Sequence, residues 1–438
     1  MVHVYGSVMR QHLILRLLVV PILATTLLST GAKQAESQKS QPCSKIGMAK
    51  KIGGVTYKCT RQGKSLVYIK VNQSSKTELD LSNDPTITNS ASLDQVSTCK
   101  IADATNPEAY ISSGFPRSSE ILGNKSTYKI LVIPISFSDL QFTNSSLNVI
   151  KTAYESANKL FTSMSYGQSS IQVSFASPQN WQSFPGPVSN YIESAGAAST
   201  TGNKFDNSAL VRTVIANYSS VASLAEFDVV DVSTANDMTY KILSEFAMPR
   251  GSGSQYATNS TVSAVAHFGM IGRAWNVAHE LGHALYGFED LYAPTKAESY
   301  LNGWDLMETS TGTSELMGWH RWLAGWLSDS QVRCVASSGN SVHFLSALNI
   351  KDTKPKFVVV KNTPTSAYVI ELRNRTDFDL VRQTLIIYSI NTAYTTGSGP
   401  VRLVGELRNA GDKVSIPGVN ISLNSITSNG ALVGIQKI

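Results

Sequence analysis

The middle of the chain shows two different spacings of apolar residues. Residues 128–137 (YKILVIPISF) are almost wholly apolar, which predicts a buried strand. Between residues 144 and 164 apolar side chains recur every three or four positions, which predicts a helix with one buried face. This alternation is typical of a mixed sheet with helices packed on it. The same reasoning predicts helices at 207–218, capped by Asn207 or Ser208, and at 274–287, and strands at 170–175, 227–232 and 262–268.

After about Val335 the pattern changes to short β-rich runs separated by Gly, Asn, Ser and Thr. No helical pattern interrupts these runs, so residues 335–438 are predicted to form an all-β, sandwich-like domain. The fold class expected for the whole chain is therefore α+β, with a mixed sheet and helices followed by this β domain. The predicted strands are 357–360, 368–372, 385–390, 401–403, 419–423 and 432–435.

The N-terminal residues have the pattern of an export signal. Arg10 and Arg16 precede an apolar run at 17–28, and Thr30-Gly31-Ala32 offers small residues at a cleavage site. The apolar run is shorter than the roughly 20 residues of a membrane span. We therefore expect residues 1–32 to be a removed signal peptide and the mature chain to be secreted, without stable membrane insertion. An uncleaved anchor that keeps the protein at the cell surface is the alternative.

Residues 33–98 are predicted to be a small cysteine-containing segment followed by a polar linker. Residues 43–71 form a compact piece with turn glycines and a strand at 66–69. Residues 71–97 are rich in Ser, Thr, Asn and Asp and lack periodicity, as linkers do. A removed pro-segment and a separate module are both consistent with this composition. The next predicted domain spans residues 99–334.

Charge and cysteine content narrow the function. The formal net charge is +6, and removing the two arginines of the signal leaves +4. This mild balance, without an obvious Lys/Arg block, argues against nucleic-acid binding. Four cysteines in an exported chain favour disulfides, which we expect between Cys43 and Cys59 and between Cys99 and Cys334. A cysteine that blocks a metal site is the alternative, but it would leave an odd thiol in an oxidising compartment.

His279-Glu280-Leu281-Gly282-His283 is the strongest chemical signal in the chain. Residues four apart on a helix lie on one face, so His279 and His283 can bind the same zinc ion. Glu280 then lies beside the metal as general base for a water molecule. The surrounding residues lack proline and are rich in Ala, Leu and Val, which favours a helix. A chance match to this short pattern is the alternative, and the residues that follow weigh against it.

A catalytic zinc site needs a third protein ligand and one open position. Gly287 lets the chain turn sharply after the helix, and Glu289 and Asp290 follow six and seven residues after His283. Either carboxylate is therefore a candidate third ligand. Two solvated carboxylates after a helix are the alternative.

A methionine-containing segment, Gly303-Trp304-Asp305-Leu306-Met307, follows, with its methionine 24 residues after His283. With the helix motif it resembles the metzincin zinc peptidases, in which such a turn forms an apolar floor beneath the metal. From about Lys129 to Trp326, and more loosely beyond, the chain resembles the immune inhibitor A family of secreted metallopeptidases. The other matching residues are Phe137-Ser138-Asp139, Ser165-Tyr166-Gly167, Trp181, Pro185, Pro187, Phe227-Asp228-Val229-Val230, Asp290-Leu291-Tyr292, Gly325-Trp326, Tyr368-Val369-Ile370-Glu371 and Leu385-Ile386-Ile387-Tyr388.

The resemblance implies a metzincin-like zinc peptidase domain at residues 99–334. The family usually has glycine three and aspartate six residues after the second histidine, where this chain has Tyr286 and Glu289. A one-residue insertion restores the match at Gly287 and Asp290, so the resemblance implies Asp290 as third ligand, with Glu289 as fallback. Calcium is a second metal that the family allows, although no acidic loop of the EF-hand type is present.

The predicted function is that of a secreted, monomeric zinc endopeptidase acting on protein or peptide substrates. Zn²⁺ would be held by His279, His283 and Asp290, and Glu280 would take the proton of the attacking water. The strand at 262–268 would align an extended peptide by main-chain hydrogen bonds.

Three positions and two other functions stay open. His267 is either an ordinary strand residue or a substrate contact, and His320 is either a packed helix residue or an oxyanion donor. Thr309 stands where some metzincins have a tyrosine over the transition state. One alternative function is a non-catalytic exported surface or binding protein with a vestigial zinc site. The other is a zinc hydrolase acting on cell-wall or glycan material.

Overall fold

A computed structural model describes most of the chain, and its residues divide into two compact units, Met1–Leu79 and Asp80–Ile438. The boundary falls within the predicted linker. The predicted signal at 1–32 and most of the linker lie outside the described residues. The described residues are 48–52, 55–62, 65–70, 93–104, 110–194, 206–236, 244–252, 256–269, 274–293, 299–308, 314–376, 383–394 and 398–438, with single positions 44, 254 and 378.

The first unit contains a three-stranded antiparallel sheet. Strands β1 (Ala49–Ile52), β2 (Val55–Gln62) and β3 (Ser65–Lys70) follow one another in chain order. Cys59 on β2 is buried and disulfide-bonded. The predicted partner, Cys43, lies outside the described residues.

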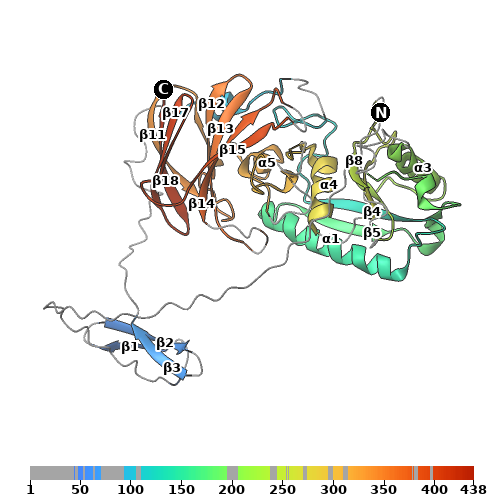
Figure 1. The fold of residues 1–438 in the computed structure, drawn as a ribbon, viewed down its shortest axis with the longest axis horizontal. Coiled ribbons are helices and arrows are strands. Elements are labelled where there is room, and N and C mark those ends of the chain that lie inside the picture. The colour runs from blue at the N-terminus through green and yellow to red at the C-terminus, as the bar shows by residue number, and fades with distance from the viewer. Residues whose placement is uncertain are drawn as a thin grey trace, which may run out of the picture. The chain divides into compact units, whose positions relative to one another are not determined.

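The second unit begins with a mixed sheet of six strands in the order β5-β4-β7-β9-β8, with β6 also paired to β4 (Figure 1). Neighbours from β5 to β9 run parallel, whereas β8 lies antiparallel to β9 and forms one of the two edges. All four predicted strands of this region are present. The bounds are β4 Thr127–Ser136, β5 Ser170–Phe175, β6 Gln182–Ser183, β7 Val229–Ser233, β8 Ser244–Met248 and β9 Ser263–Phe268.

Strand β4 is buried on both faces, because helices cover the sheet on both sides. Its residues Tyr128, Ile130 and Val132 join a core with α1 (Asn144–Met164) and α4 (Ala274–Tyr286). Leu131, Ile133 and Ile135 point the other way, into a core with α3 (Asn207–Ser219). This period of two is what a strand between two helical layers requires.

The two predicted helices α1 and α3 are confirmed, but one cap is not. Helix α1 has the predicted bounds and begins with a capping box in which Thr143 accepts a hydrogen bond from the Ser146 amide. The cap of α3 is Asp206, whose carboxylate accepts from Ser208 N at 2.9 Å, and not Asn207 or Ser208. Asn207 bonds instead to the backbone of Glu193, which explains the one-residue error.

The C-terminal part is a sandwich of two sheets, with strand orders β10-β12-β13-β14-β15 and β11-β18-β17-β16 (Figure 1). Its six predicted strands are present, and β10, β11 and β16 are additional. The bounds are β10 Val332–Val335, β11 Gly339–Ser346, β12 Phe357–Thr363, β13 Ser366–Arg373, β14 Thr384–Asn391, β15 Val401–Leu407, β16 Lys413–Ile416, β17 Val419–Ile426 and β18 Gly430–Lys437.

The first of these sheets has both faces buried. Val359 and Val369 join the core that contains α1 and α4, whereas Val358 and Ile370 face the second sheet. The α+β class expected from the sequence is therefore observed. The remaining short helices are η3 Val96–Cys99, η4 Pro178–Asn180, η5 Val188–Asn190, η6 Leu306–Glu308, α5 Gly318–Leu323 and η7 Asp329–Gln331. Among the described helices, none is long and apolar enough to cross a membrane.

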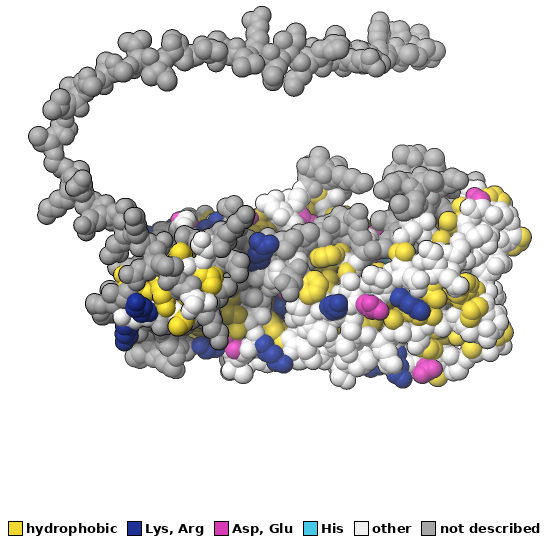
Figure 2. All heavy atoms as spheres, turned by 90° about the horizontal axis from the view of Figure 1, so that it is seen from below, with side chains coloured by type: hydrophobic (Ala, Val, Ile, Leu, Met, Phe, Trp, Pro, Cys, Tyr) yellow, Lys and Arg dark blue, Asp and Glu magenta, His cyan; other side chains and the backbone are white. Residues whose placement is uncertain are grey.

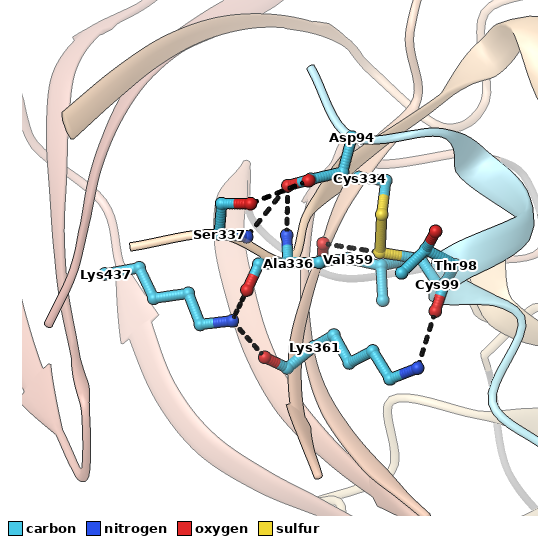
Figure 3. The surroundings of a disulfide bond; sticks show 9 residues. All are labelled: Asp94, Thr98, Cys99, Cys334, Ala336, Ser337, Val359, Lys361 and Lys437. Atoms are coloured by element: carbon cyan, nitrogen blue, oxygen red, sulfur yellow. Dashed lines mark hydrogen bonds between the residues drawn. A yellow bond between two sulfur atoms is a disulfide. The ribbon is translucent and has the colours of Figure 1, made fainter. Parts of the chain in front are cut away.

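The predicted disulfide between Cys99 and Cys334 is confirmed and joins η3 to β10 (Figure 3). Asp94 adds to this attachment, because its carboxylate accepts hydrogen bonds from Ala336 N at 2.6 Å and Ser337 N at 2.9 Å. Lys361 Nζ donates to the carbonyl of residue 98 at 2.9 Å. The start of the second unit is thus held against the sandwich.

Replacing Cys99 and Cys334 by alanine should lower the free energy of unfolding. The bridge closes a loop of 235 residues, and loss of such a cross-link typically costs about 2–5 kcal/mol. Urea unfolding of the two proteins measures the difference. An Asp94→Ala variant, which keeps the bridge, should lose less. An unchanged midpoint in the double variant would show that the bridge does not stabilise the fold.

Candidate metal centre

The two histidines of the motif lie on the buried helix α4, one turn apart. Every apolar residue of α4 except the partly buried Trp275 is buried in the sheet-facing core, and His279 and His283 are 5% and 6% exposed. Their ring centroids are 4.9 Å apart. The helix therefore presents both imidazoles at one place, as predicted from the spacing of four.

Backbone carbonyls fix which ring nitrogen of each histidine carries hydrogen. His279 Nδ1 lies 3.1 Å from Leu306 O, and His283 Nδ1 lies 2.5 Å from Phe288 O. A carbonyl only accepts, so each Nδ1 donates a hydrogen bond. In the neutral rings Nε2 then carries a lone pair, which is the form that binds metals.

Asp290 completes a triangle of atoms with these two nitrogens. Its Oδ1 lies 3.1 Å from His279 Nε2 and 3.2 Å from His283 Nε2, and the two nitrogens are 3.3 Å apart. Zn–N and Zn–O bonds of about 2.0–2.1 Å at tetrahedral angles imply ligand–ligand distances of roughly 3.3 Å. The donor set and its spacing fit zinc with a fourth position left for a small ligand.

The electrostatics of the triangle also call for a cation. Burial by itself lowers the pKa of His283, but the Asp290 carboxylate outweighs it and raises the pKa to about 9. For His279 as well the net shift is upward against the effect of burial. Burial would raise the pKa of Asp290, yet the two histidines hold it well below its usual range. Three acceptor atoms this close are stable only with a proton or a metal ion between them.

Glu280 is a second buried carboxylate in the electrostatic field of the two histidines. It is 3% exposed, and burial raises its pKa to about 6 even though His279 and His283 act in the opposite direction. Its Oε2 has no hydrogen-bond partner within the described residues. A buried, unpaired carboxylate oxygen with a pKa near neutrality has the properties of a general base.

The end of α4 explains why Asp290 and not Glu289 reaches the triangle. Gly287 ends the helix at φ +60°, and a Cβ there would lie 1.9 Å from Tyr110 O. Arg117 binds the carbonyls of Tyr286 and Gly287, so its cation neutralises the carbonyl end of the helix. Glu289 lies in the field of Arg117 and is not part of the converging group.

The methionine turn packs beneath the histidines. Met307 is fully buried in η6, and a Cβ on Gly282 would lie 2.8 Å from its sulfur. Glycine between the two histidines therefore allows the turn and α4 to touch. Leu291 N donates to Met307 O at 2.9 Å, which also ties the turn to the segment that carries Asp290.

Asp305 holds the turn in place. Its Oδ1 accepts from Met307 N at 2.8 Å, and its Oδ2 accepts from Met317 N at 2.7 Å. His320 Nδ1 lies 3.0 Å from the same Oδ2, and its ring packs on Phe288 with centroids 4.6 Å apart. His320 is thus 1% exposed and supports the turn, which agrees with the packed alternative and not with an oxyanion donor.

His267 is fully buried and pairs with a carboxylate of the neighbouring strand. Its Nδ1 lies 3.0 Å from Asp231 Oδ1, and Asp231 accepts further hydrogen bonds from Tyr154 and Ser233. Strand β9, which carries His267, has neighbours on both sides, so the expectation that it aligns a peptide is wrong. The edge strand next to β9 is β8, and β5 forms the opposite edge.

Comparisons with known proteins do not assign the chain. No protein-family model and no curated protein matches it. Among solved structures, metalloproteinase-II from Bacteroides fragilis is similar over 62% of this chain and 75% of its own, at 12% identity and a TM-score of 0.24. A likeness of this size carries neither fold nor activity across.

The structure thus brings together three of the predicted residues and adds supports that the sequence did not reveal. His279, His283 and Asp290 form the one converging group of three or more His, Cys, Asp or Glu side chains found among the described residues. Calcium binding stays a prediction. The sequence pattern did not identify Asp305 or Asp231 as supporting residues. For Asp231 a signal existed, because it is a charged residue inside an otherwise apolar run.

Asp305→Asn should weaken zinc binding. An amide has one acceptor oxygen where the carboxylate has two, so one of the two contacts that hold the turn, to Met307 N or to Met317 N, is lost. The turn carries Leu306 O, which orients the His279 ring. Loss of such outer contacts typically costs about 10–100-fold in metal affinity. Competition with a chelator measures it. Asp412→Asn is the matched control, because Asp412 also accepts two backbone amides, at Arg408 and Asn409. Equal zinc affinities in both variants would contradict this role of Asp305.

Stability should fall as the pH rises through about 9, because of His267. Burial lowers the pKa of His267, but Asp231 raises it to about 9. The charged pair therefore stabilises the fold fully below the ordinary value of about 6.5, and this contribution is lost as His267 deprotonates. The loss is on the order of 3 kcal/mol, from about 1.4 kcal/mol for each unit of the pKa difference.

Urea unfolding from pH 6.5 to 10 tests this, with His267→Gln expected to lack that part of the pH dependence. His343→Gln is the control, because burial lowers the pKa of His343 to about 4 and keeps it neutral in this range. If the free energy of unfolding of the His267 variant fell with pH as steeply as that of the wild type, His267 would not be the group responsible.

Proposed function

We propose that this protein is a zinc-dependent endopeptidase. The proposal rests mainly on the three acceptor atoms of His279, His283 and Asp290, which converge at tetrahedral spacing. The adjacent Glu280, buried and with an unpaired oxygen, adds the base that hydrolysis requires. A vestigial site would have no need for a base of this kind.

Each residue has a distinct task in the proposed reaction. His279, His283 and Asp290 hold zinc, which when bound polarises the scissile carbonyl and makes water acidic enough to attack at neutral pH. Glu280 accepts the proton of the attacking water and passes it to the leaving amine. The Leu306 and Phe288 carbonyls keep both imidazoles in the tautomer that the metal requires.

The edge strand β8 is the element best suited to align a substrate. Residues Ser244–Met248 lie at the end of the strand order, antiparallel to β9. An extended peptide can add to such an edge by main-chain hydrogen bonds, which recognises protein substrates without selecting one sequence. Secretion of the chain, expected from the N-terminal sequence pattern, and its action as a monomer are further parts of the proposal.

Glu280→Gln should keep zinc and lose peptidase activity. The substitution preserves the shape of the side chain but cannot accept a proton, and removal of a general base typically costs about 10²–10⁴-fold. Hydrolysis of a casein-type substrate and the zinc content of the purified variant measure the two effects. A fully active variant would exclude Glu280 as the base.

Two neighbouring carboxylates give the matched comparison. Asp290→Asn should lose both zinc and activity, whereas Glu289→Gln should keep both, because only Asp290 belongs to the triangle. Folded wild-type protein without stoichiometric zinc would favour the non-catalytic binding protein. Zinc-loaded protein that cleaves glycan but not peptide substrates would favour the other hydrolase.

A further inference from the structure

The positive charge of the chain is concentrated in the small first unit. Residues 43–71 contain seven Lys and Arg residues and no Asp or Glu. Residues 72–438 contain 26 Lys and Arg against 30 Asp and Glu, so the large unit and linker are slightly acidic. The mild overall charge therefore conceals a strongly basic segment. Its basic residues are Lys45, Lys50, Lys51, Lys58, Arg61, Lys64 and Lys70.

Five of these basic residues lie on the strands of the unit's sheet, whereas Lys45 and Lys64 lie outside the described residues. All three strands carry at least one basic residue. Lys50 and Lys51 are both exposed and successive on β1, so they lie on opposite faces of the sheet. In the register, Tyr57 pairs with Lys50 on one side and with Lys70 on the other. The Lys50 ammonium also lies over the ring of Tyr68, 5.9 Å from its centroid.

Nothing within the segment neutralises this charge, because the segment has no carboxylate side chain. Seven like charges on so small a unit repel one another, and bound anions relieve that repulsion. By contrast, residues 72–438 carry acidic side chains as well as basic ones, and some of both are visible in Figure 2 in magenta and dark blue. The basic unit is therefore the part of the chain that is complementary to an anionic partner.

The residue types and their placement favour a polymer. Six of the seven cations are lysines, which bind phosphates as point charges and not as bidentate forks. Such a site responds to the density of charge and selects no particular group. A flat bilayer would touch one face of the sheet, whereas a flexible chain can reach Lys50 and Lys51 together.

We propose that strands β1–β3, with their basic residues Lys50, Lys51, Lys58, Arg61 and Lys70, are a docking site for a linear polymer of the polyphosphate type, outside the unit that carries the metal centre. The lysines recognise the repeated negative charges of the polymer. Pairing of lysine with phosphate releases the counterions of the lysines and the cations condensed on the polymer. Such binding would keep the covalently attached second unit near a surface or matrix that carries the polymer. This function does not depend on the metal centre.

The test uses the full chain from residue 33 with Glu280→Gln, and long-chain inorganic polyphosphate as the probe. We expect binding whose log–log salt slope is about −3, as for roughly four phosphate contacts. The double substitution Lys50→Gln and Lys51→Gln should weaken binding about tenfold or more at low salt and flatten the slope by about 1.4. The control pair, Lys351→Gln and Lys413→Gln, removes two exposed lysines of the second unit and should change affinity less than about twofold.

Several results would overturn the proposal. Equal weakening by the two pairs would show diffuse attraction, and equal binding of orthophosphate at the same total phosphate would show a small-anion site. Tighter binding, at equal charge, to phosphatidylserine–phosphatidylcholine vesicles or to single-stranded DNA would identify a bilayer or a nucleic acid as the partner. Circular dichroism of each variant ensures that a loss of binding is not a loss of folding.

Discussion

The structure of the second unit is organised around three acceptor atoms that are forced together out of water. Two imidazole nitrogens and one carboxylate oxygen lie 3.1–3.3 Å from one another and are largely buried. Such an arrangement is unfavourable without a positive charge among them, since each atom presents a lone pair to the others. The surrounding fold therefore has to hold this unfavourable geometry, and much of its detail serves that purpose.

The support comes from backbone groups more than from side chains. Leu306 and Phe288 carbonyls orient the rings, and both belong to segments that leave α4 and return beneath it. The return requires Gly287 at positive φ, and the close approach of the turn requires Gly282, because a Cβ at either place would meet other atoms. The two glycines and the two histidines are thus parts of one constraint, and a helix with the motif alone would not form the centre.

Local spacing of apolar residues could be read from the sequence, whereas contacts between distant backbone groups could not. The bounds of helix α1 and strand β5 were predicted without error. The spacing of apolar residues along the chain indicates which side chains are buried, and this spacing differs between helices and strands. The ligand pair followed from the same periodicity. Strand β8 and the true sheet edge were missed, since a half-exposed edge strand lacks a continuous apolar run. The roles of Asp305 and Arg117 were also missed, because both bind backbone groups that are distant in sequence and meet them only when the loops have folded.

The β-sandwich belongs to the same support. Glu371 on β13 accepts from Gly318 N at 2.7 Å, next to Met317, whose amide binds Asp305. Arg373 on the same strand donates to Trp304 O at 3.1 Å. Both charges are fully buried, and buried charges are stable only when paired and hydrogen-bonded, so they fix one register between the turn and the sandwich. Every second residue of β13 packs into the same core as α4, for example Val369. The position of His279 on α4 therefore depends on a strand that lies about ninety residues later in the chain.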